Sequence, residues 1–252
     1  MGMRRFEGKV CVVTGASSGI GLASAARFVE EGGKVVCFAR DGAALERECA
    51  RLGEHALAVA GDVTCGADLD RLFERVGERH GRVDVLFANA GIAEFFPFAE
   101  VDAAHFDRVF HTNVRGLFFS VQKALPLMGQ GGAVVLNTSV AGGMGVARTS
   151  VYSASKAAVS SLSRTLASEL SAHGIRVNAV SPGPTESAIH QKYAAQMSPA
   201  ALEELSAKTM QRLLLGRLAH AAEVASAVAF LAAPEASFVV GQELGVDGGL
   251  SL

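Results

Sequence analysis

Short apolar runs alternate with longer amphipathic stretches along this chain, and that alternation limits the possible folds more than any other feature. The apolar runs are Val10–Val13, Val35–Phe38, Ala56–Val59, Val83–Phe87, Ala133–Leu136, Ile175–Val180 and Glu243–Val246, and amphipathic stretches at Leu22–Glu30, Ala43–Leu52 and Ala67–Arg79 follow the first three. Strands that are apolar along nearly their whole length are buried on both faces, as in a parallel sheet covered by helices. Right-handed crossovers place those helices on both sides. We therefore predict an α/β protein with a doubly wound Rossmann fold and a parallel sheet of about seven strands.

The chain contains no obvious domain boundary. No linker rich in Pro, Gly or Ser and no internal repeat divides its 252 residues, so we expect a single domain over residues 1–252. The least regular region runs from about 183 to 215, where Pro184 and Pro199 interrupt helical pieces. An irregular insertion of that length in a compact domain is typical of a lid, and we expect one here.

Charge and cysteine content limit the possible partners. The net charge is −2, so bulk charge attracts neither nucleic acid nor an anionic membrane, and no apolar run approaches the ~20 residues of a membrane span. The four cysteines form no C-x-x-C pair and no zinc-site spacing, and no signal-peptide core follows Met1. We expect a soluble cytoplasmic protein without a metal, whose partners are small molecules or copies of itself.

A glycine-rich turn follows the first predicted strand and leads directly into a helix. Glycines at such a turn let the backbone approach a pyrophosphate, and the helix N-terminus offers unpaired N–H groups. The spacing is G-x-x-x-G-x-G, and no Gly-Lys-Ser/Thr of a Walker loop follows. The turn predicts a dinucleotide site, with contacts from Gly15, Ser17, Ser18, Gly19, Ile20 and Gly21.

The end of the second predicted strand bears on the choice of cofactor. A carboxylate at this place binds the ribose 2′-hydroxyl of NAD, whereas a guanidinium suits the 2′-phosphate of NADP. We place Ala39 at the strand tip and Arg40 directly after it, which favours NADP over NAD. Asp41 leaves NAD open, because a shift of one residue would turn its carboxylate toward the ribose; alternatively, Asp41 is the N-cap of the helix from Ala43.

The ends of the third and fourth strands supply further cofactor contacts. Asp62 and Val63 can present a carboxylate and a backbone N–H to an adenine edge. Asn89, Ala90 and Gly91 end the fourth strand with small residues that permit close backbone approach. All of these predicted contacts lie at the carboxyl edge of the sheet.

Tyr152 and Lys156 are four residues apart, so on a helix they share one face. An ammonium near a phenol favours the phenolate and lowers the phenol's pKa. The pair is therefore a candidate acid-base device, although a solvated Lys and a half-buried Tyr would give the same spacing.

Together these elements resemble the short-chain dehydrogenase/reductase family over essentially the whole chain. The matching elements, in family order, are Thr14–Gly21, Asp62, Asn89–Gly91, Asn113, Ser139, Tyr152 with Lys156, and Pro182–Gly183. The resemblance implies that Asn113 steadies a water relay behind Lys156, and that Pro182, Gly183 and Thr185 hold the nicotinamide, although Thr185 follows the Pro-Gly pair sooner than in many relatives. It also implies a homotetramer, formed through the helices that carry Asn113 and Tyr152 and through the C-terminal strand.

Carbonyl reduction by a hydride needs a proton donor for the oxygen and a second group aimed at it. We assign the proton transfer to Tyr152, the second hydrogen bond to Ser139, and to Lys156 both the lowering of the Tyr pKa and a bond to the nicotinamide ribose. The predicted substrate is an apolar ketone or secondary alcohol. Its wall would comprise Phe95, Phe96, Met144, Val146 and Ile189, unless these residues are core or subunit contacts.

Three other functions stay open. A 3-oxoacyl-carrier-protein reductase would need a basic surface, for which Lys123, Arg148 and Arg176 are scattered candidates. An NAD-dependent alcohol dehydrogenase would use Asp41. A dinucleotide-binding protein without turnover is the alternative from another class, and such proteins are expected to lack one of the proton-transfer residues, all of which are present here.

Overall fold

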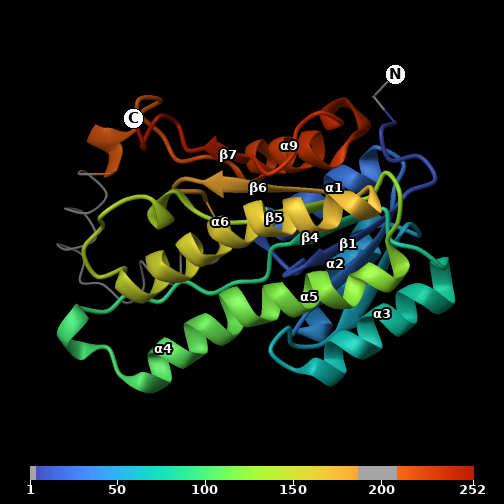
Figure 1. The fold of residues 1–252 in the computed structure, drawn as a ribbon, viewed down its shortest axis with the longest axis horizontal. Helices are drawn as coiled ribbons and strands as arrows, with labels where there is room; N and C mark the ends of the chain where they lie inside the picture. Colours follow the sequence, from blue (N-terminus) through green and yellow to red (C-terminus); the bar gives the residue numbers. More distant parts are fainter. Residues whose placement is uncertain (1–3, 187–208) are drawn as a thin grey trace.

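The computed structural model describes residues 4–186 and 209–252, and its core is one parallel sheet of seven strands in the order β3-β2-β1-β4-β5-β6-β7 (Figure 1). The strands are β1 Val10–Thr14, β2 Lys34–Ala39, β3 Ala56–Ala60, β4 Val85–Ala88, β5 Ala133–Asn137, β6 Arg176–Pro182 and β7 Glu243–Val246. Each coincides with a predicted apolar run to within a few residues. The predicted Rossmann fold is therefore confirmed.

Helices cover both faces of the sheet. They are α1 Gly19–Glu30, α2 Gly42–Leu52, α3 Gly66–His80, α4 Ala103–Phe110, α5 Leu117–Ala124, α6 Ser150–Leu170 and α9 Ala221–Ala232. A π-helical turn, His111–Gly116, joins α4 to α5, and the three pieces run on as one rod in Figure 1. None of the helices in the described part of the chain is long and apolar enough to cross a bilayer.

Alternate residues of each strand pack into two separate cores. Val12 of β1 belongs to the core under α3, α5 and α6, whereas its neighbours Cys11 and Val13 belong to the core under α1, α2 and α9. All three side chains are fully buried. Burial on both faces explains why these strands are apolar without interruption.

The strand order reverses beside β1, which pairs with β2 on one side and with β4 on the other. In an open parallel sheet, a ligand crevice lies at the carboxyl ends of the strands at such a reversal. The predicted cofactor residues follow these ends. The predicted lid at about 183–215 falls mostly on residues 187–208, which lie outside the described residues, as does Ile189.

Candidate active site

The glycine turn depends on backbone angles that favour glycine. Gly15 and Gly19 have φ of +68° and +56°, a region that L side chains rarely adopt. A Cβ on Gly21 would lie 2.6 Å from Asn89 Nδ2 and closer still to the Gly15 carbonyl oxygen. Ser18 precedes α1 as its N-cap and makes no side-chain cap hydrogen bond. The first N–H groups of α1, beside Ser17 and Ile20, are thus not capped by Ser18 and suit a phosphate.

Asn89 braces this turn from the end of β4. Its Nδ2 donates to the carbonyl oxygens of Thr14 at 2.9 Å and Gly15 at 3.2 Å. The backbone N–H groups of Asn89 and Ala90 both donate to Thr14 Oγ1 at 3.0 Å. Thr14 was not predicted as a site residue. A hydroxyl that ends an otherwise apolar strand is the feature of the sequence that points to it.

Arg40 directly follows β2, as predicted, and Asp41 caps α2. The Asp41 carboxylate accepts a hydrogen bond from Ala44 N at 2.9 Å, which confirms the N-cap interpretation of this residue. Arg40 Nη1 lies 3.9 Å from Asp62 Oδ2. The carboxylate near the Arg40 guanidinium is therefore that of Asp62.

Arg40 and Asp62 share a hollow of about 360 Å³ whose other lining residues are Thr64, Arg108, His111 and Thr112. The Asp62 Oδ1 atom accepts hydrogen bonds from Thr64 N and Oγ1, both at 2.8 Å, which fixes the carboxylate at this wall. Val63 is buried against Gly116, where a Cβ would lie 2.7 Å from Val63 Cγ2. Arg108, His111 and Thr112 were not predicted, because α4 and the π-helical turn after it reach this wall only through the tertiary fold.

Tyr152 and Lys156 both lie on α6, one turn apart, and Lys156 Nζ is 5.9 Å from the centroid of the Tyr152 ring. Nζ donates to the Asn137 carbonyl oxygen at 2.8 Å, and burial lowers the pKa of Lys156 to about 8. Burial also raises the pKa of Tyr152, and a hydrogen bond with Ser139 opposes that rise. Burial outweighs that opposing effect, so the pKa of Tyr152 lies above its ordinary value, and the lowering expected from Lys156 stays a prediction.

Ser139 lies two residues after the carboxyl end of β5. It begins the 3₁₀ turn Val140–Gly142. Its Oγ accepts a hydrogen bond from Ala141 N at 3.3 Å and donates to the Pro182 carbonyl oxygen at 3.5 Å, and Ser139 opposes the effect of burial on the pKa of Tyr152. The structure thus brings Ser139, Tyr152 and Lys156 together, as the sequence predicted.

Asn113 lies in the π-helical turn and is buried. Its Oδ1 accepts from Ile92 N at 2.8 Å, and its Nδ2 donates to Ile92 O at 2.9 Å and to Ser155 Oγ at 3.0 Å. Ser155 Oγ in turn donates to the Tyr152 carbonyl oxygen at 2.7 Å. The amide therefore ties the segment after β4 to α6, and the water relay expected of Asn113 stays a prediction.

Asn137 links the two sides of the site and was not predicted. Its Nδ2 donates to Asn89 Oδ1 at 2.8 Å, and its carbonyl oxygen accepts from Lys156. Its Oδ1 is buried, and no donor among the described residues bonds it. Asn137 is a polar residue at the end of a buried strand that lies between two other strands, and this pattern could have identified it.

The last residue of β6 and the turn after it are predicted to contact the nicotinamide. Gly183 N donates to Val246 O at 3.0 Å, and a Cβ on Gly183 would lie 2.7 Å from Asp247 Cα. Thr185 is buried, and its Oγ1 donates to the Gly183 carbonyl oxygen at 3.0 Å. That bond closes the local turn. Contact between a nicotinamide and Thr185 or Pro182 stays a prediction.

The predicted substrate wall divides into two parts. The Phe95 ring meets the Tyr152 ring edge to face, with centroids 5.4 Å apart and planes at 87°. Phe96 instead packs on His105 of α4 at 4.5 Å. Met144 and Val146 lie in the loop before α6, where Val146 is exposed. Phe95 is thus the aromatic residue of this set that contacts Tyr152.

Two of the three basic residues considered for a carrier-protein surface have structural roles. Arg176 donates to the carbonyl oxygens of Leu231 and Ala233 at 2.9 and 3.1 Å and so closes the end of α9. Lys123 is paired with Asp70. Arg148 is exposed and has a φ of +69°. These three residues do not gather into one basic surface.

Comparison with known proteins identifies the family of this chain. The profile of the enoyl-(acyl carrier protein) reductase family matches residues 15–251. The chain belongs to the short-chain dehydrogenase/reductase family and is an oxidoreductase. It is 41% identical to a cis-4-hydroxycyclohexanecarboxylate dehydrogenase of Sinomonas cyclohexanicum, over 97% of each chain.

Solved structures agree with this assignment. The crystal structure of a levodione reductase matches with a TM-score of 0.93 and 34% identity, over 98% of this chain and 99% of that one. A 3-ketoacyl-(acyl-carrier-protein) reductase of Brucella melitensis, solved with NADH, matches at 0.88 and 34%, again over 98% and 99%. A short-chain dehydrogenase of Burkholderia cenocepacia, solved with NADP, matches at 0.90 and 30%, over 98% and 100%. Structural neighbours therefore bind nicotinamide dinucleotides of both kinds.

Proposed function

We propose that this chain transfers a hydride between NADP(H) and a carbonyl group or secondary alcohol, with Tyr152 as general acid and base. The observation that carries the proposal is the placement of Tyr152 and Lys156 one turn apart on α6, with Lys156 Nζ 5.9 Å from the centroid of the Tyr152 ring and Ser139 near enough to oppose the rise in the pKa of Tyr152. Two donors and one cation at the carboxyl edge of the sheet form the set of groups that carbonyl reduction needs.

The residues around this set fit a dinucleotide. The uncapped N-terminus of α1 and the glycine turn suit a pyrophosphate. The hollow between Arg40 and Asp62 suits an adenosine group. Lys156 would hold the nicotinamide ribose, and the turn at Pro182, Gly183 and Thr185 would hold the carboxamide. When bound, the nicotinamide supplies or accepts the hydride.

Proton transfer then falls to the chain's own residues. In reduction, the Tyr152 hydroxyl donates its proton to the carbonyl oxygen while Ser139 donates a second hydrogen bond. Burial raises the pKa of Tyr152, so the phenol keeps its proton at neutral pH and is ready to act as an acid. Lys156, with a pKa of about 8, is mostly protonated at that pH and stabilises the phenolate that results.

Replacing Tyr152 with Phe tests the mechanism directly. The variant lacks the proton donor, so we expect kcat to fall by about 10²- to 10⁴-fold, while NADPH affinity changes little. Both are measured on the purified chain, by steady-state turnover and by cofactor fluorescence. Unchanged turnover would refute the mechanism, and tight NADPH binding without turnover of a broad ketone panel would favour the non-enzymatic alternative.

NADP is the proposed cofactor because Arg40 follows β2 and Asp41 is engaged as the cap of α2. We expect Arg40→Asp to weaken NADPH binding by about 10- to 100-fold, the loss expected for hydrogen bonds to a charged group, and to leave NADH binding less affected. Titration with both cofactors measures this. A wild-type chain that prefers NADH would instead favour the NAD-dependent alcohol dehydrogenase.

The proposed substrate is an apolar ketone or secondary alcohol. The contact of Phe95 with Tyr152 supports an apolar wall. The relative named for cis-4-hydroxycyclohexanecarboxylate makes a six-membered cyclic alcohol the first compound to test. The 3-oxoacyl-carrier-protein reductase alternative is supported by a similar solved structure but not by the placement of Lys123 and Arg176, and a short 3-oxoacyl thioester in the same panel distinguishes the two.

We propose a cytoplasmic homotetramer for the assembled protein. Large apolar side chains are exposed on α4, α9 and β7, at Phe106, Phe230 and Leu244, and α4 adjoins the helical turn that carries Asn113. Light scattering in solution tests the proposal, and a monomer at all concentrations would refute it.

A further inference from the structure

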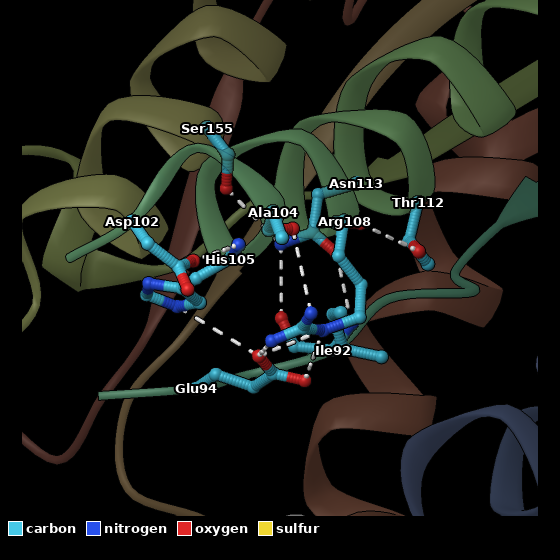
Figure 2. A network of polar contacts seen from close by, with 9 residues as sticks. All are labelled: Ile92, Glu94, Asp102, Ala104, His105, Arg108, Thr112, Asn113 and Ser155. Carbon is cyan, nitrogen blue, oxygen red and sulfur yellow. Dashed lines mark hydrogen bonds and ion pairs between the residues drawn. The ribbon is translucent and has the colours of Figure 1, made fainter. Parts of the chain in front are cut away.

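The segment between β4 and α4 carries the aromatic residue that contacts Tyr152, and a cluster of polar side chains holds this segment in place. Figure 2 shows the cluster, in which Glu94 points from the segment toward Arg108 and His105 of α4. None of these three residues has a role in the proposed proton transfer.

Glu94 and Arg108 form a two-point ion pair. Arg108 Nη2 donates to Glu94 Oε2 at 2.7 Å, and Nε lies 3.1 Å from each carboxylate oxygen. Such a fork matches the planes of the two groups and fixes their relative orientation. A solvent-exposed ion pair usually contributes little to folding stability. This pair, however, joins a loop to a helix residue that is fourteen positions away in the sequence, so it can fix the position of the loop.

His105 supports the pair from the buried side. Only 4% of it is exposed, its Nε2 lies 3.7 Å from Glu94 Oε2, and Phe96 covers its ring. Neither ring nitrogen has a hydrogen-bond partner among the described residues. A buried polar group without a hydrogen-bond partner costs free energy, and the Glu94 carboxylate lies beside the ring as its ion-pair partner whenever the imidazole is protonated.

The segment is fixed at both ends by other means. At its start, Asn113 binds both backbone polar groups of Ile92. At its end, Asp102 Oδ1 accepts from His105 N at 2.7 Å and starts α4. Glu94 lies between these anchors, directly before Phe95.

We propose that Glu94 and Arg108, with His105, are positioning residues that hold Phe95 edge-on against Tyr152 and thereby limit the size of the ketone that reaches the phenol. This inference rests on the proposed function for its consequence in catalysis. The placement of Phe95 against Tyr152 can be tested without turnover.

The chain suits a spectroscopic test, because it has two tyrosines and no tryptophan. Phenolate absorbance is titrated without cofactor in the wild type, in Tyr152→Phe to isolate the Tyr152 signal, and in Glu94→Arg and Arg108→Glu. Freeing Phe95 lets water reach the phenol, so we expect the pKa of Tyr152 to fall toward its ordinary value in both single variants. The double variant Glu94→Arg/Arg108→Glu restores the ion pair with reversed charges and should return the pKa to that of the wild type.

A matched control and a second readout complete the experiment. Glu48→Arg breaks the pair with Arg51 on α2, on the opposite face of the sheet, and should leave the Tyr152 titration unchanged. At saturating NADPH, Glu94→Arg should lose about tenfold in the ratio of kcat/KM for a small cyclic ketone to that for a bulky one, with kcat for the small ketone within about threefold, and the double variant should recover the ratio.

The outcomes separate this inference from the proposed function. If the wild type turns over no ketone but the titrations behave as expected, the proposed function fails and the positioning role stands. An unchanged titration in Glu94→Arg, or a double variant that does not recover, overturns the positioning role. If Glu94→Arg does not fold, Glu94→Gln carries the same comparison, because it removes the charge and keeps the size.

Discussion

The glycine turn at residues 14–21 and the β4–α4 segment at 92–102 are stabilised by different interactions. Backbone conformation fixes the turn, through positive φ at Gly15 and Gly19 and through Asn89 bonded to main-chain oxygens. Side chains from distant elements fix the segment, through Asn113 on Ile92, Arg108 on Glu94 and Tyr152 on Phe95. We infer that the glycine turn tolerates few substitutions, whereas the β4–α4 segment can change the proposed substrate specificity by exchanging side chains.

The largest effect should come from adding one methyl group to the turn. Alanine is normally a better helix residue than glycine, but in Gly21→Ala the Cβ would meet the Gly15 carbonyl oxygen and Asn89 Nδ2. We expect the free energy of unfolding to fall by about 3 kcal/mol, with loss of NADPH binding, measured by chemical denaturation and fluorescence titration. Gly66→Ala, at a helix start with open space around it, is the control and should stay within about 0.5 kcal/mol of the wild type.

The same contrast explains how much the sequence could predict. Local sequence patterns were enough to predict the seven strands, the glycine turn, Arg40 after β2 and the Asp41 cap. Each depends on the hydrophobic pattern, the strand ends or the glycine positions in a short stretch of sequence. The grouping of Ser139, Tyr152 and Lys156 could be predicted from a resemblance. Arg108 and His105 could not, because they meet Glu94 only after α4 packs beside the loop.

The electrostatics of Tyr152 and Lys156 could not be predicted from spacing either. The i, i+4 rule brings the two residues onto one face, but it carries no information on desolvation. The surrounding core buries both groups and lowers the pKa of Lys156 to about 8. Spacing therefore predicts which groups meet, and packing decides how they titrate.

A second prediction tests this buried charge. Lys156 has a pKa of about 8 when folded and about 10.4 when unfolded, so between these values the unfolded chain binds more protons. The free energy of unfolding should therefore rise with pH in this window, by about 2 kcal/mol from pH 8 to pH 10 for this group. Tyr152, with its pKa raised by folding, acts in the opposite direction only above about pH 10.

Denaturant unfolding of the cofactor-free chain at a series of pH values measures the effect. The Lys156→Met variant lacks the titrating group, and its free energy of unfolding should be flatter than that of the wild type between pH 8 and pH 10. Equal slopes in the two proteins would mean that Lys156 titrates normally and is better hydrated than its placement implies.

The smallest of the three effects concerns Asn137, which joins the two sides. Asn137→Ala removes the donor to Asn89 Oδ1 and leaves that partly buried acceptor unpaired, so we expect a loss of about 1 kcal/mol in unfolding free energy. Because Asn89 braces the Thr14–Gly15 turn, NADPH affinity should also fall, by about tenfold. Asn178→Ala is the matched control, since Asn178 bonds Val239 O and Gln242 N away from the turn. It should lose similar stability and keep its NADPH affinity, whereas an equal loss of affinity in both variants would show that Asn137 has no special role in holding the turn.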